Sequence, residues 1–169
     1  DQWSTSISSF FEVSQGGRFS YTYGGDLNGD GNGGNDLIYV PTSSEVNQMN
    51  FAGAGEAAAY DAFISQDDYL SGRRGDYAER YGAVSPWTTR VDVKFLQDYK
   101  IKVSENKTNT IQFSIDVLNA GNMVNSNWGL VQQPNSVQPI GVSVDATGTP
   151  NYSFNANQTE TFGYDSSLA

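Results

Sequence analysis

The stretch Thr89–Val103 reads TRVDVKFLQDYKIKV and alternates between two kinds of side chain. Its odd-numbered positions from Val91 onward are mostly apolar or aromatic. Its even-numbered positions carry charges at Asp92, Lys94, Asp98, Lys100 and Lys102. A repeat of two residues is the repeat of a β-strand, so this stretch predicts a long strand with two unlike faces.

A second stretch, residues 110–118, alternates in the same way, with Ile111, Phe113, Ile115 and Val117 opposing polar neighbours. The polar residues 104–109 lie between the two stretches, so together they predict a hairpin. The first strand far exceeds the usual length of roughly 5–6 residues. Its two faces suit a barrel wall between lipid and a wet lumen, and equally a half-exposed sheet of a soluble extracellular domain.

Composition excludes several classes of function. Nineteen acidic residues oppose nine Lys and Arg, giving a net charge of −10, so a nucleic-acid partner is not expected. The chain has no His and no Cys, which removes the usual imidazole base and the disulfide-stapled class. No carboxylate pair stands in a context that fixes catalytic spacing, so the chain is predicted not to be an enzyme.

The amino-terminal part also alternates, which predicts a strand over residues 3–24. Gly16 and Gly17 interrupt the pattern, and we interpret them as a bulge within one strand rather than a turn between two. Tyr21 and Tyr23 are placed where the aromatic girdle of a barrel lies. No run of 18 apolar residues is present, so no transmembrane helix is predicted.

A Gly, Asn and Asp segment follows at residues 24–36. Its start, Asp26, Asn28, Asp30 and Gly31, reproduces the first half of a calcium loop, and Asp36 is the nearest late carboxylate. Leu37 stands where the bidentate Glu of such a loop belongs. These four oxygen-bearing residues are therefore candidate calcium ligands, and the alternative is a flexible turn that binds nothing.

Residues 25–87 as a whole are predicted as a long loop, with a short strand at 37–40 and a short helix within 52–81. Arg73, Arg74 and Arg80 stand among acidic residues, which favours mutual ion pairing over a grip on a substrate. Residues 119 to about 165 form a second long loop, with a strand at Ile140–Val144 and none at 165–169. Long loops at one end and a short turn at the other are typical of outer-membrane barrels.

Several stretches, taken together and in order, resemble the carboxy-terminal barrel of TonB-dependent outer-membrane transporters, most closely the Oar-like group of Bacteroidota. They are residues 17–31 (GRFSYTYGGDLNGDG), 35–41 (NDLIYVP), 86–87, 92–98 (DVKFLQD) and 116–122 (DVLNAGN). The family ends in one more strand that closes in an aromatic residue, whereas this sequence ends in Leu168-Ala169. The chain is therefore expected to be a carboxy-terminal fragment.

The resemblance implies an all-β fold of antiparallel strands that form part of a large, plugged transmembrane barrel. Its strands are expected at about 3–24, 88–103 and 110–119, and its extracellular loops, containing a short helix, at 25–87 and 120–165. It implies nutrient import across the bacterial outer membrane. The implied partners are the rest of the barrel, the plug domain, the TonB complex, membrane lipid and a surface lipoprotein. The alternative is a secreted calcium-binding β-domain that acts in adhesion or ligand binding.

Overall fold

The computed structural model describes residues 2–165, which fold mostly as antiparallel strands with few helices. The described chain divides into two units. The first comprises residues 2–15, 87–131 and 164–165, and the second comprises residues 16–86 and 132–163. No helix among the described residues is long and apolar enough to cross a membrane.

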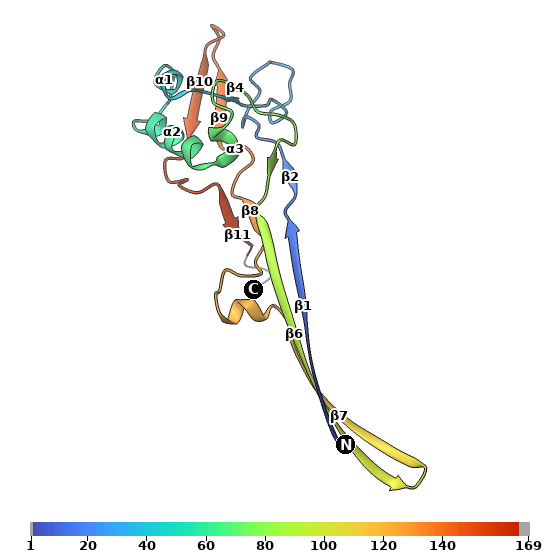
Figure 1. Cartoon of the computed structure of the whole chain (residues 1–169). Coiled ribbons are helices and arrows are strands. Elements are labelled where there is room, and N and C mark those ends of the chain that lie inside the picture. Colours follow the sequence, from blue (N-terminus) through green and yellow to red (C-terminus); the bar gives the residue numbers. More distant parts are fainter. Residues whose placement is uncertain (1, 166–169) are drawn as a thin grey trace. The chain divides into compact units, whose positions relative to one another are not determined.

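The first unit is built on a sheet of three strands in the order β1 (Trp3–Gln15), β6 (Trp87–Ser104) and β7 (Lys107–Val117) (Figure 1). Both pairings are antiparallel. The long strand predicted from residue 88 and its hairpin partner are confirmed, because alternation along both stretches matches the two faces of a sheet. The 3₁₀ helix η1 (Ala120–Met123) follows β7.

The predicted six-residue turn at 104–109 is too long. Only Glu105 and Asn106 connect the strands, because Ser104 already pairs with Lys107. A register shift between Lys102 and Ser104 adds one residue, Val103, to β6 at this point. The polar residues after the turn pair like any others, since backbone groups make the ladder whatever the side chain.

The single strand predicted over residues 3–24 is wrong beyond Gln15. β2 (Arg18–Phe19) pairs instead with β5 (Ala83–Val84), in the second unit. The predicted bulge is also wrong: the Gly16 N–H donates to the Pro86 carbonyl, and the Ser85 N–H donates to the Gly17 carbonyl, with no extra residue. A Cβ on Gly16 would overlap the Ser85 side chain, so glycine there permits close approach of the two backbones.

The second unit has its own hydrophobic core, and Tyr21 and Tyr23 lie inside it. The prediction that these two tyrosines form an aromatic girdle is therefore wrong, because both side chains are buried among protein atoms. Alternation alone does not say what covers the apolar face. The largest fully buried side chains of this core are Tyr21, Tyr60, Phe63, Ile38, Ile64, Leu70 and Ile140.

Three short helices frame this core. α1 (Ser43–Val46) begins with a capping box, in which Thr42 and Glu45 exchange side-chain and backbone hydrogen bonds. α2 (Glu56–Gln66) confirms the helix expected within residues 52–81 but ends earlier. Asp67 is extended there, and its carboxylate caps α3 (Asp68–Ser71) by accepting from the Leu70 N–H.

Strands from both predicted loops complete the unit. β3 (Tyr39–Val40) pairs with β4 (Asp76–Tyr77). β9 (Ile140–Val144), which has its predicted bounds, pairs with β10 (Pro150–Phe154). β8 (Gln132–Pro134) pairs with β11 (Phe162–Tyr164).

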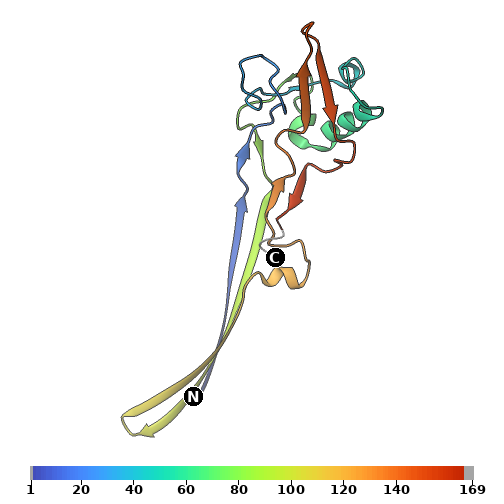
Figure 2. The ribbon, with the colours of Figure 1, turned by 180° about the vertical axis from the view of Figure 1, so that it is seen from behind.

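The β9–β10 hairpin lies beside α2 (Figure 2). The two pack together through aromatic side chains, since the centre of the Phe154 ring lies 5.3 Å from that of the Tyr60 ring and 5.5 Å from that of the Phe63 ring. The two segments predicted as separate loops therefore share one core. Residue 165 is not in a strand, as predicted. The rest of that prediction, for residues 166–169, lies outside the described residues.

Candidate functional site: a two-faced sheet with a pocket

The β1–β6–β7 sheet exposes a continuous apolar face. Up to the pair Ile101–Asn109, odd-numbered residues stand opposite odd-numbered residues, as in Ile7 opposite Phe95 and Phe95 opposite Ile115, so these side chains share one face. Ile7 is 73% exposed and Phe113 is 58% exposed. The large exposed apolar side chains of this face are Trp3, Ile7, Phe11, Val13, Trp87, Ile101, Ile111, Phe113 and Ile115, and the exposed Val103 lies at the register shift of β6.

Two polar side chains on this apolar face satisfy each other. The Thr5 hydroxyl donates to the Gln97 amide oxygen at 2.7 Å, and the Gln97 amide nitrogen donates to the Ser4 carbonyl at 3.1 Å. Unpaired polar atoms would be costly wherever such a face is covered by apolar material. The pairing therefore lowers the cost of placing Thr5 and Gln97 in an apolar environment.

The opposite, even-numbered face is mostly polar, with the exposed Phe10 as an exception, and several of its charges pair across strands. Lys94 on β6 lies 3.1 Å from Asp116 on β7, and Arg90 on β6 lies 3.6 Å from Glu12 on β1. The Gln112 amide donates to Asp98 at 2.8 Å. Such pairs are worth little individually in water, but they fix which residues stand opposite each other.

Residues 119–131, called the return segment below, fold back onto this polar face. The Asn119 N–H donates to the Asp92 carboxylate at 2.8 Å, near the start of the segment. Near its end, the Thr88 hydroxyl lies 3.5 Å from the Leu130 carbonyl. Asp92 and Thr88 are even-numbered residues of β6, so the segment lies on the side opposite the apolar side chains.

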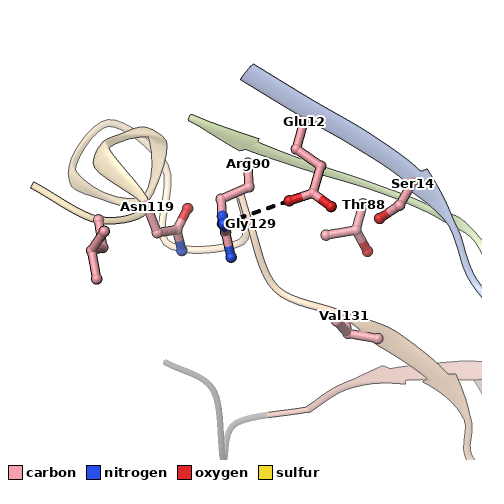
Figure 3. Close-up of a pocket in the computed structure, with 8 residues that line it drawn as sticks. Glu12, Ser14, Thr88, Arg90, Asn119, Gly129 and Val131 are labelled. Carbon is pink, nitrogen blue, oxygen red and sulfur yellow. Dashed lines mark ion pairs between the residues drawn. The ribbon is translucent and has the colours of Figure 1, made fainter. Parts of the chain in front are cut away.

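A cavity of about 400 Å³ lies between the return segment and the two strands β1 and β6 (Figure 3). Glu12 and Arg90 face each other in it, and Arg90 also lies 3.3 Å from Asp92. The residues that line the cavity are Glu12, Ser14, Thr88, Arg90, Leu118, Asn119, Gly129 and Val131. Charged, hydroxyl and amide groups therefore share one small space.

Asn119 and Gly129 fix the conformation of the return segment where it lines this cavity. Asn119 adopts a left-handed backbone with φ of 50°, and its amide nitrogen donates to the Trp128 carbonyl at 3.3 Å. Gly129 has φ of 75°, and a Cβ there would overlap the Asn119 amide. The return segment thus requires glycine at this position for both backbone and space.

The four candidate calcium ligands lie in one hydrogen-bonded loop. Asp26 accepts from the Gly29 N–H at 2.7 Å, and the Asn28 amide lies between Asp36 at 2.6 Å and Asp30 at 3.3 Å. Donation from the Asn35 amide helps keep the pKa of the Asp30 carboxyl below its usual value. These oxygens already accept N–H groups of their own loop, the pattern of consecutive Asx turns.

Within residues 2–165, no group of three or more His, Cys, Asp or Glu side chains has the arrangement of a metal site. The loop nevertheless brings Asn28, Asp30 and Asp36 together as the sequence predicted. Calcium binding stays a prediction.

Ion pairing, which the sequence favours for the three arginines, is confirmed for Arg73 and Arg74. Arg73 lies 3.4 Å from Asp76 and 3.0 Å from Glu79, and Arg74 lies 2.8 Å from Asp61. The Arg80 guanidinium instead lies 5.3 Å from the centre of the Tyr81 ring. Arg73 and Arg74 therefore stabilise their own loop.

Comparison of the chain with protein-family models, with curated proteins and with solved structures finds no match. Sequence reasoning missed Glu12, Arg90 and the return segment as parts of one site. The alternation of residues 3–13 and 89–103 already placed Glu12 and Arg90 on polar faces. The pairing register, which the alternation does not specify, makes them neighbours.

Proposed function

We propose that the chain is part of the wall of a large outer-membrane barrel of the TonB-dependent transporter type, which imports a scarce nutrient. The observation that carries the proposal is the exposed apolar face of the β1–β6–β7 sheet. A contiguous exposed apolar patch that extends over three strands is unusual on a soluble monomer, and it is typical of an interaction with lipid or with another apolar surface.

The length of this face supports lipid as the partner. Trp87 begins β6, and the Trp3–Tyr99 ring pair, with ring centres 4.5 Å apart, lies further along it, so aromatic residues stand at two ends of a central apolar band. Ile101 and Val103 continue along β6 beyond this band. Twelve residues separate the two ends, about 40 Å along a strand. A tilt of about 40° reduces this to about 30 Å along the membrane normal, near the thickness of an apolar band flanked by aromatic girdles.

The sheet edges support a larger assembly. β1 and β7 are the outer strands of this sheet in the described chain. Three strands cannot close a ring, and an open edge in lipid would leave backbone groups unpaired. Further strands would complete the wall, with the even-numbered charges facing a wet lumen and a plug. The sequence resemblance adds the TonB complex, a surface lipoprotein and the outer membrane to this proposal.

Site-directed spin labelling tests the proposal on two neighbouring positions of β1. In membranes, a label at Ile7→Cys is expected to meet lipid-soluble oxygen more than a water-soluble nickel chelate. A label at Ser6→Cys, on the other face, is expected to show the reverse. Equal access of the chelate to both labels, with the protein recovered in the aqueous fraction, would refute a lipid-facing wall.

The second candidate function is a secreted calcium-binding β-domain, favoured by the convergence of Asn28, Asp30 and Asp36 in one loop. A calcium-dependent rise in melting temperature that Asp30→Ala abolishes would support an ion site. Asp145→Ala is the matched control, because Asp145 also caps its own exposed turn through N–H groups. No response to calcium in the unsubstituted protein would exclude a calcium site in this loop.

A further inference from the structure

The cavity beside the return segment combines groups that recognise a solute from several sides. We propose that it binds a small polar solute that is neutral overall and carries both hydrogen-bond donors and acceptors. Its position in the lumen, near the outer ends of β1 and β6, rests on the proposed function. The binding chemistry rests on the cavity alone.

Arg90 has hydrogen-bond donors to spare. A guanidinium carries five N–H groups, and both of its ion pairs, to Glu12 and to Asp92, are made through Nη2. The Nε and Nη1 donors of Arg90 have no partner among the described residues. They are available to oxygens of a solute, and the second carboxylate oxygen of Glu12 is available to a donor.

The charge balance of the cavity argues against an ionic solute. Glu12 and Asp92 together oppose one Arg90, so the cluster carries one net negative charge and would repel an anion. A cation would have to compete with Arg90 for the two carboxylates. A neutral solute can instead add hydrogen bonds to Arg90 and Glu12 without breaking either ion pair.

The walls and size of the cavity fit a small solute. Leu118 and Val131 supply apolar surface, while the hydroxyls of Ser14 and Thr88 supply groups that both donate and accept. A volume of about 400 Å³ is at the small end of the range for ligand sites. The close contact of Gly129 with the Asn119 amide fixes the side of the cavity that the return segment forms.

Isothermal titration of the complete protein in detergent micelles tests the proposal with three probes of different charge type. Sucrose is uncharged and offers hydroxyl groups, glycylglycine is a zwitterion with no net charge, and succinate is a dianion. Saturable binding of sucrose or glycylglycine is expected. The probe that binds shows whether the cavity recognises hydroxyl groups or the charged groups of a zwitterion. Tighter binding of succinate, or no binding of either neutral probe up to about 50 mM, would overturn the proposal.

Two variants locate the binding. Arg90→Gln is expected to weaken binding by about tenfold or more, because it removes charge-assisted hydrogen bonds. Ser14→Ala, which leaves both ion pairs intact, is expected to weaken binding by about threefold. Lys94→Gln is the matched control, since it removes a cation from the same face of β6, outside the cavity. Equal losses in Arg90→Gln and Lys94→Gln would overturn the assignment.

Failure of this proposal can be told apart from failure of the barrel. If Ile7→Cys is shielded in lipid but no neutral probe binds, only the cavity assignment is wrong. If a probe binds with the expected variant pattern while Ile7→Cys is open to water, the cavity assignment holds but its place in a lumen does not.

Discussion

Replacing Ile7 by Lys puts a charge on the apolar face of β1 and gives the sharpest test of what covers that face. Ile7 lies four residues from Trp3, about 13 Å along the strand and about 10 Å along the membrane normal at a tilt of about 40°. In a band about 30 Å thick, this position is about 5 Å from the midplane. We therefore expect a loss of about 2–3 kcal/mol, in the lower half of the range of about 2–4 kcal/mol for a midplane Lys.

The assay is reversible unfolding by urea of the complete barrel in phospholipid vesicles. A loss of about 2–3 kcal/mol corresponds to roughly a 30- to 140-fold fall in the folded-to-unfolded ratio. Ser6→Lys is the control, because Ser6 is the neighbouring residue on the polar face, opposite Leu96. If the two variants differ by less than about 0.5 kcal/mol, the apolar face does not contact lipid, since surface changes in water have effects of that size.

Three further predictions concern the second unit and the return segment. Asp67→Ala should lower the free energy of unfolding by about 2–4 kcal/mol, measured by chemical denaturation. The substitution removes the cap of α3 and the acceptor of the hydrogen bond from the buried Tyr21 hydroxyl, at 2.9 Å. The neighbouring substitution Asp68→Ala should lower it far less. Burial raises the pKa of the Tyr23 phenol to about 12. The neutral phenol is therefore favoured in the folded state, so the stability contributed by Tyr23 should be complete below about pH 10 and fall by about 2–3 kcal/mol as pH rises towards 12, measured by tyrosinate absorbance during unfolding. Burial also raises the pKa values of Tyr21 and Tyr60, which adds to the fall. Gly129→Ala should displace the return segment and make its limited proteolysis faster. Gly148→Ala is the control, because Gly148 has φ of 83° and open space around it, so only the strain of a left-handed backbone is expected there. Equal effects of the two substitutions would contradict the role of the Asn119 contact.

The long strands were predictable because their determinants are local. Alternation over residues 89–103 and 110–118 needs no knowledge of the rest of the chain, and β6 and β7 follow it closely. The end of β1 was not predictable in this way. Tyr21 and Tyr23 continue the alternation but are covered by residues such as Ile140, more than a hundred positions away.

The candidate site was predictable in part for the same reason. Which face Glu12 and Arg90 occupy follows from parity, but their proximity follows from register, which depends on side chains of two strands about eighty residues apart. The return segment contains four Asn residues and no charge, so it resembled an open loop. Its attachment to the sheet depends on single hydrogen bonds, such as the one from the Asn119 N–H to Asp92. A periodic sequence pattern does not predict such bonds.

The two faces of the sheet constrain the same register. A slip of one residue between β1 and β6 would turn Glu12 towards the apolar face and Phe11 towards the polar face. In water both changes would be tolerable, because each face is exposed. Against lipid, the buried carboxylate would be costly and Arg90 would lose a partner. The cross-strand pairs Glu12–Arg90 and Lys94–Asp116 are therefore best understood as register markers, whose value rises with the apolarity of whatever covers the opposite face.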